Sequence, residues 1–273
     1  MADVSGAKRF LRNVGILLAG ALVLVYFAAF ALLVAWQRDL LFIGTQYGPA
    51  SVSQGYGARV VQERDGTLLT VWEMAPPRAG APTIVFFYGN GGRLYHFAQV
   101  GRVLNGDGYA ILLASYRGYS GNPGRPSEAG LMDDARAVLA GRPAAKTILW
   151  GQSLGTGIAA RMAAEGRASA LILQSPYTSV VDVAAARFPI YPVRMAMWDS
   201  FDTLSIVDRI KVPVLILHGT DDLTVPFAMG GIVAGRLGAR ATLVPIEGGT
   251  HDLVPADLLP PARAWLARHG AGR

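Results

Sequence analysis

The hydrophobic pattern is dominated by residues 14–36, which contain no charged side chain. At about 1.5 Å per residue, a helix over these positions is about 34 Å long, which exceeds the roughly 30 Å hydrocarbon core of a bilayer. Backbone groups inside lipid must be satisfied within their own segment, so the run predicts a helix rather than strands. No later apolar run approaches this length, and we therefore expect a single membrane span.

Basic residues are distributed unequally around this run. Arg38 alone follows it closely, whereas three basic residues precede it, namely Lys8, Arg9 and Arg12. The positive-inside rule therefore predicts a cytoplasmic arm at residues 1–13, a signal anchor at 14–36 and a domain at 37–273 on the far side, whether periplasmic, lumenal or extracellular. A cleaved signal peptide is the alternative because residues 29–31 read Ala-Phe-Ala, although its apolar region usually has only about 7–15 residues.

Beyond the anchor, short apolar runs alternate with amphipathic segments and turns. Runs at 60–64 and 68–73 flank Asp65-Gly66, which is a hairpin signal. Further apolar runs are typical of parallel strands buried on both faces and lie at 83–88, 109–115, 147–150, 170–173, 214–217 and 242–246. Helices are expected at 127–142, 154–165, 226–237 and 262–268. This alternation predicts an α/β fold with a mostly parallel central sheet flanked by helices.

Composition narrows the function classes. The chain is 52% hydrophobic and 16% charged, against about 25% charged in an average soluble domain, which excludes a disordered chain. It contains no Cys, so a disulfide scaffold and a cysteine metal site are excluded. The net charge of +6 is spread without a basic run or nucleic-acid motif, so we expect no nucleic-acid partner. We also expect neither a cofactor nor a metal.

The strongest chemical motif is Gly151-Gln-Ser153-Leu-Gly155, which follows an apolar strand and precedes a helical segment. This arrangement is typical of a nucleophile elbow, a turn too tight for side chains at the flanking positions that exposes Ser153. The chain is rich in Gly, so the bare motif is weak and an ordinary Gly-rich turn is the alternative.

The order of the other candidate residues strengthens this interpretation, because α/β hydrolases run Ser, acid, His along the chain. His251 follows the strand at 242–246, and Asp221 and Asp222 both follow the strand at 214–217. Spacing alone does not choose between these two acids. Of the remaining histidines, we expect His218 to be structural, His96 to lie at the surface or the pocket rim, and His269 to lie in a solvated tail.

An oxyanion hole for such a site needs two backbone N–H groups. One is the N–H of Leu154, directly after the nucleophile. The second is expected from the turn at 88–92, Tyr-Gly-Asn-Gly-Gly, whose glycines allow close approach of the backbone. We assign it to Asn90.

These residues resemble the membrane-anchored α/β-hydrolase-domain proteins of the serine aminopeptidase-like hydrolase family. The resemblance covers roughly residues 40–266. It rests on the motifs at 88–92, 116–121, 126–130, 151–157, 175–179, 218–226 and 248–253. The family pattern His-Gly-x-x-Asp-x-x-Val-Pro aligns its acid with Asp222, and it implies Ser153 as nucleophile and His251 as base.

The same resemblance implies an α/β-hydrolase catalytic domain over residues 37–273. Tyr88 departs from the His found in many relatives, which affects the loop rather than the catalytic residues. Three further matching residues are expected to make structural ion pairs, namely Arg117, Asp133 and Asp134.

The sequence therefore predicts a serine hydrolase that forms an acyl-enzyme and acts on carboxylic or lipid esters, as an esterase, lysophospholipase or thioesterase does. The segment at 176–211 is too short for a large lid, so we expect a minimal cap whose apolar side chains either line an acyl groove or cover the sheet edge. Pro189 and Pro192 make one long helix there unfavourable. A serine peptidase and a catalytically idle membrane-anchored binding protein are the alternatives.

Overall fold

The computed structural model describes residues 4–49, 51–92 and 94–270. The side chains of residues 4–7 and of His96 lie outside this description, and so does the predicted rim position of His96. The chain divides into two compact units, Met1–Leu40 and Leu41–Arg273.

The first unit is built on helix α1 (Val4–Ala35), and α2 (Gln37–Leu41) follows it along the chain. An 18-residue window within Lys8–Ala35 has a mean hydropathy of 2.7, and this part of the helix is long and apolar enough to cross a membrane. The helix starts before the predicted position 14, because its polar first turns contain Lys and Arg, which favour helix formation.

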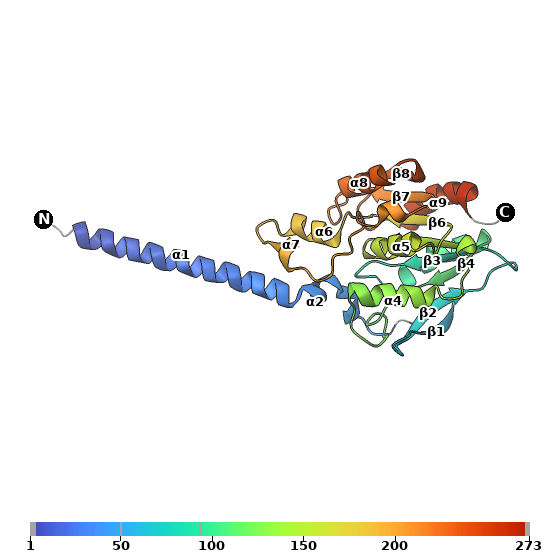
Figure 1. Cartoon of the computed structure of the whole chain (residues 1–273), viewed down its shortest axis with the longest axis horizontal. Coiled ribbons are helices and arrows are strands. Elements are labelled where there is room, and N and C mark those ends of the chain that lie inside the picture. The colour runs from blue at the N-terminus through green and yellow to red at the C-terminus, as the bar shows by residue number, and fades with distance from the viewer. Residues whose placement is uncertain (1–3, 50, 93, 271–273) are drawn as a thin grey trace. The chain divides into compact units, whose positions relative to one another are not determined.

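The second unit contains one eight-stranded sheet in the order β1-β2-β4-β3-β5-β6-β7-β8 (Figure 1). Its strands are β1 (Gly57–Gln62), β2 (Leu68–Met74), β3 (Thr83–Phe87), β4 (Ala110–Leu113), β5 (Thr147–Gln152), β6 (Ala170–Gln174), β7 (Val214–Gly219) and β8 (Ala241–Ile246). The strand β2 pairs antiparallel with β1 and β4, and the other pairings are parallel. The predicted α/β fold with an antiparallel hairpin at its start is confirmed.

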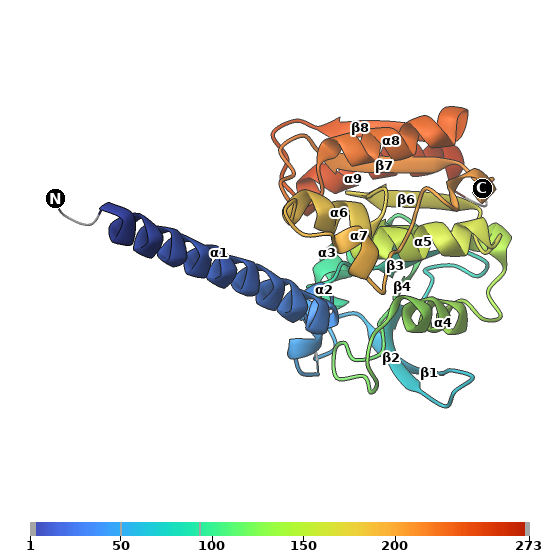
Figure 2. The same cartoon turned by 60° about the vertical axis from the view of Figure 1, so that its left-hand side comes forward.

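Helices cover both faces of the sheet (Figure 2). The face with α3 (Ala98–Gly106) and α9 (Pro255–His269) lies opposite the one with α4 (Glu128–Val138), α5 (Leu154–Ala164) and α8 (Phe227–Leu237). The strands β4, β6 and β7 are buried throughout, as expected of strands covered on both sides. Short 3₁₀ turns complete the unit: η1 (Ile43–Gln46), η2 (Leu94–Phe97), η3 (Ala144–Lys146), η4 (Val207–Arg209) and η5 (Gly238–Arg240).

Three helices of the second unit differ from the sequence prediction, and one of them, α4, ends at Val138 rather than at 142. The sequence pattern did not reveal α3, which contains Gly101, Asn105 and Gly106, all weak helix formers. The last helix begins at Pro255 rather than at 262, with Pro260 and Pro261 inside it. There, packing outweighs the local penalty, because Leu258, Ala262, Trp265 and Leu266 of α9 are buried.

Two short helices occupy the connection between β6 and β7, α6 (Val180–Arg187) and α7 (Val193–Ala196). The break between them contains Pro189 and Pro192, in agreement with the expectation that no single long helix forms there. The apolar side chains of this region differ in exposure: Phe201 is 2% exposed, whereas Met195 is 89% and Trp198 59% exposed.

Candidate active site

Ser153 lies in the turn between β5 and α5 with φ 49° and ψ −120°, a left-handed conformation that is strained for a residue with a side chain. The two flanking glycines make this turn sterically possible. A Cβ on Gly151 would lie 2.4 Å from the carbonyl oxygen of Gly155, and a Cβ on Gly155 would lie 2.0 Å from that of Phe87. The Ser153 N–H donates to Gln174 O at 2.9 Å, which ties the turn to the end of β6.

The fold brings Ser153, His251 and Asp222 together from the ends of three different strands. The Nε2 atom of His251 lies 3.0 Å from Ser153 Oγ, and its Nδ1 lies 2.7 Å from Asp222 Oδ2. A carboxylate only accepts, so Nδ1 carries the proton that it donates to Asp222 and Nε2 is free to accept from the serine hydroxyl. This is the hydrogen-bond order that a serine nucleophile and its general base require.

The loops that carry the acid and the histidine are tied together. The N–H of Asp221 donates to Gly249 O at 2.9 Å, and that of Gly248 donates to Thr220 Oγ1 at 2.9 Å. Gly219 allows this approach, because its Cβ would lie 2.2 Å from Gly249 O. Of the two candidate acids, Asp222 is 5% exposed and faces His251, whereas Asp221 is exposed to solvent.

Several donors converge on the Asp222 carboxylate. Its Oδ1 accepts from the N–H groups of Thr224 at 2.9 Å and Val225 at 2.8 Å, and His218 Nε2 lies 3.4 Å from Oδ2. Burial by itself would raise the pKa of Asp222, but the hydrogen bonds from His218, His251 and Val225 outweigh it and hold the pKa below its ordinary value. The group is therefore a carboxylate at neutral pH.

The turn at 88–92 lies directly against the nucleophile. A Cβ on Gly89 would lie 3.1 Å from Ser153 Cβ and 3.7 Å from its Oγ. The carbonyl of Gly89 accepts from Gly92 N–H at 3.0 Å. Because C=O and N–H point in opposite directions across a trans peptide, the N–H of Asn90 is directed away from that turn. Leu154 is the first residue of α5, so its N–H belongs to the helix end that favours negative charge.

The groups that hold this turn were not predicted from the sequence. Tyr116 donates through its hydroxyl to Tyr88 O at 2.9 Å, and Tyr119 does so to Asn90 O at 3.0 Å. The N–H of Gly44 also donates to Asn90 O, at 2.8 Å. The motif at 116–121 marked the two tyrosines without a role, and nothing in the local pattern marked Gly44. Tyr88 itself is buried, with its hydroxyl 3.1 Å from Ser115 Oγ.

Among the described residues, no group of three or more His, Asp or Glu side chains could hold a metal ion. His218, expected to be structural, is fully buried with Nε2 2.9 Å from Val225 O. It thus contacts both the acid and the turn that holds the acid.

Comparison with known proteins identifies the fold family. A family profile described as alpha/beta hydrolase fold matches residues 82–196. An uncharacterized protein of Mycobacterium tuberculosis is 34% identical over 200 residues, which are 71% of each chain. The lysophosphatidylserine lipase ABHD12 of Danio rerio is 33% identical over 187 residues, which are 58% of this chain and 48% of that protein.

Solved structures show the same fold. The esterase Est2 of Thermogutta terrifontis, with butyrate bound, superposes with a TM-score of 0.64 and 22% sequence identity, over 80% of this chain and 95% of that one. The chain belongs to the α/β-hydrolase family. Its general activity is therefore hydrolysis. The candidate catalytic residues are Ser153, His251 and Asp222.

Proposed function

We propose that this protein is a serine hydrolase that cleaves carboxylic esters of lipid-like substrates through an acyl-enzyme. The observation that carries the proposal is the hydrogen-bonded order Ser153–His251–Asp222, with distances of 3.0 Å and 2.7 Å. The esterase and the lysophosphatidylserine lipase among its similar proteins support an ester as the scissile bond.

The reaction begins when Ser153 Oγ attacks the ester carbonyl and passes its proton to His251 Nε2. Asp222, held as a carboxylate, keeps the Nδ1 proton of His251 in place and stabilises the imidazolium that forms. The N–H groups of Leu154 and Asn90 bind the oxyanion. The imidazolium then protonates the leaving alkoxide, and water activated by His251 releases the acid and regenerates Ser153.

An apolar surface supports a lipid-like substrate. The connection from α6 to β7 exposes Phe188, Ile190, Met195 and Trp198, and Leu223 beside the acid is 95% exposed. Exposed apolar side chains gathered in one segment are typical of surfaces that contact lipids or partners. In this proposal the segment receives the acyl chain of an amphiphilic ester.

The proposal includes a single membrane span formed by the Lys8–Ala35 helix, with the N-terminus in the cytoplasm and residues 37–273 on the far side. The apolar length of the helix and the basic residues Lys8, Arg9 and Arg12 support it. Fusing alkaline phosphatase to the C-terminus should give activity in an export-competent bacterium, whereas a C-terminal reporter that works only in the cytoplasm would contradict this orientation.

The central experiment treats the full chain in detergent with a fluorophosphonate probe, with Ser153→Ala as the control. Labelling of the wild-type chain alone is expected. If neither chain is labelled, the serine hydrolase proposal fails. Esters of graded chain length and matched peptide amides then test the bond: faster turnover of amides than of esters would favour a peptidase instead.

A further inference from the structure

We infer that Gly44 and Tyr119 are positioning residues for oxyanion binding, and that residues 42–46, which follow α2 along the chain, therefore support the catalytic site. This inference rests on the proposed function, in which the N–H of Asn90 binds the oxyanion. It assigns a role to residues 42–46, which precede the whole sheet and lie outside the matched family profile.

The carbonyl of Asn90 is held by two donors from opposite parts of the chain. Gly44 N–H donates to it at 2.8 Å and Tyr119 Oη–H at 3.0 Å. The carbonyls of Tyr88 and Gly89 are also occupied, by Tyr116 Oη–H and by Gly92 N–H. With these three consecutive carbonyls fixed, the planar peptide between Gly89 and Asn90 cannot turn, and its N–H keeps one direction.

Gly44 packs so closely against Asn90 and Tyr119 that a side chain at this position would clash with them. A Cβ on Gly44 would lie 2.3 Å from Tyr119 Cε1 and 2.8 Å from Asn90 O. The neighbouring Ile43 side chain reaches the same loop, because its Cδ1 would be 3.2 Å from a Cβ on Gly91. These distances show that the η1 turn packs against the loop itself, and any side chain at position 44 would displace one of the two partners.

The side chains of Phe42 and Thr45 hold the η1 segment in position. Phe42 is 1% exposed, and its ring centroid lies 6.4 Å from that of Phe201. Thr45 closes the turn by donating its Oγ1–H to Phe42 O at 2.9 Å. The Gly44 amide is therefore presented by a buried anchor rather than by a loose connection.

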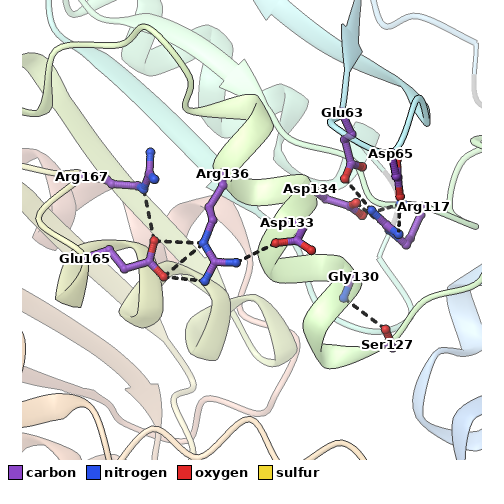
Figure 3. Close-up of polar contacts among 10 residues, drawn as sticks. All are labelled: Glu63, Asp65, Arg117, Ser127, Gly130, Asp133, Asp134, Arg136, Glu165 and Arg167. Atoms are coloured by element: carbon purple, nitrogen blue, oxygen red, sulfur yellow. Dashed lines mark hydrogen bonds and ion pairs between the residues drawn. The ribbon is translucent and has the colours of Figure 1, made fainter.

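The second donor to Asn90 O, the hydroxyl of Tyr119, is also held in position by its neighbours. The ring of Tyr119 packs against Tyr88 and Tyr116, with centroid distances of 5.8 and 5.5 Å. Between the two donor tyrosines, Arg117 binds Asp134 of α4 through its backbone N–H and its Nε, both at 2.7 Å (Figure 3). Burial raises the pKa of Tyr119, so its hydroxyl keeps its proton and can donate at neutral pH.

Preorganised donors contribute to catalysis because they need not reorient when the oxyanion forms. A chain that begins after Gln46 would lack the Gly44 donor, whereas a chain cut at the Ala29-Phe-Ala31 sequence would keep it. The hydrogen bond from Gly44 N–H to Asn90 O thus makes residues 42–46 part of the support of the oxyanion loop.

The test compares Tyr119→Phe and Gly44→Ala with the wild-type chain, on a short soluble ester in detergent. Active sites are counted by fluorophosphonate titration, so kcat refers to labelled Ser153 only. We expect kcat to fall about fivefold in Tyr119→Phe, the ratio that corresponds to one hydrogen bond, and further in Gly44→Ala, with KM unchanged. The control is Tyr56→Phe, which removes a bond of the same kind to Ala98 O, and it should retain wild-type kcat.

A second measurement separates positioning from a merely structural role. The inhibition constant of a trifluoromethyl ketone, whose adduct with Ser153 carries an oxyanion, should rise in the same ratio as kcat/KM falls. Unchanged kcat per labelled site in both variants, or an unchanged inhibition constant, would overturn the inference. Failure of the wild-type chain to label would instead refute the proposed function, so the two failures are distinguishable.

Discussion

The imidazole of His218 lies against the carboxylate of Asp222, with 3.4 Å between His218 Nε2 and Asp222 Oδ2. The same Nε2 lies 2.9 Å from Val225 O, and a carbonyl only accepts, so Nε2 carries a proton. Its Nδ1 is buried, has no hydrogen-bond partner among the described residues, and faces Gly230, where a Cβ would lie 2.3 Å away. The acid therefore sits between two imidazoles, of which only His251 also reaches the nucleophile.

This arrangement predicts different effects at the two neighbouring acids. Replacing Asp222→Asn removes the charge that holds the His251 tautomer, and kcat should fall about 10³–10⁴-fold. Asp221→Asn alters an exposed side chain and should keep kcat within about twofold of the wild type. Steady-state kinetics on a soluble ester compares them; a larger loss in Asp221→Asn would refute the assignment of the acid.

The low pKa of Asp222 also has a direct consequence for pH. A carboxyl whose pKa is lowered by folding stabilises the native state above its ordinary pKa, and this contribution is lost as the pH falls toward the native pKa. The wild-type chain should thus lose stability more steeply than Asp222→Asn as the pH is lowered below about 4. Melting temperatures of both chains, measured across this pH range, test the prediction. An equal decline of the two melting temperatures with falling pH would contradict it.

The turn around the nucleophile predicts a steric limit. In Gly155→Ala the new methyl group would lie 2.0 Å from Phe87 O, where only backbone can yield. We expect a loss of at least about 1–3 kcal/mol of unfolding free energy together with loss of fluorophosphonate labelling. Gly235→Ala in α8, where a Cβ would meet no atom within 4 Å, is the matched control and should be neutral or slightly stabilising. Equal melting temperatures of the two variants would contradict this account of the elbow.

A buried ion-pair cluster predicts a second pH effect. Arg117 contacts Glu63, Asp65 and Asp134, while Arg136 binds Asp133 in a separate, exposed group (Figure 3). Burial and the proximity of Asp134 raise the pKa of Glu63 to about 8. The native state therefore keeps a proton that the unfolded chain releases near its ordinary pKa, so stability declines as the pH rises between these two values.

Replacing Glu63→Gln should remove this dependence, because an amide mimics the protonated acid. The melting temperature of the variant relative to the wild type should increase between about pH 5 and pH 9. Asp133→Asn, which alters an ion pair with a 62% exposed carboxylate, should run parallel to the wild type. A constant difference between Glu63→Gln and the wild type would show that Glu63 is ionised throughout.

The exposed apolar segment predicts a substrate-dependent defect. Met195→Glu places a charge on this surface and should lower turnover of a long-chain lysophospholipid roughly tenfold, with little change on a short soluble ester. Gln99→Glu makes an equivalent charge change at an exposed position of α3 and should affect neither substrate. Equal losses on both esters would show that Met195 acts on folding or catalysis rather than on lipid binding.

Features that depend on local sterics and periodicity could be predicted from the sequence. Buried parallel strands require continuous apolar runs, and each predicted run became a strand of the sheet. The tight turn at Ser153 admits only Gly at positions 151 and 155, so the motif was readable without a structure. The helix α3 and the start of α9 were not predicted, because packing there outweighs an unfavourable local helix propensity.

Contacts between residues that are distant in the sequence depend on the packing of the whole fold and could not be predicted in this way. The residues alone left Asp221 and Asp222 open, because the direction of a side chain in a loop depends on the loop packed beside it, here the one at Gly249. Gly44 carried no signal, since a backbone N–H is present at almost every residue. Its significance comes from its position 2.8 Å from Asn90 O, which is set by the packing of Phe42 and Tyr119 around it.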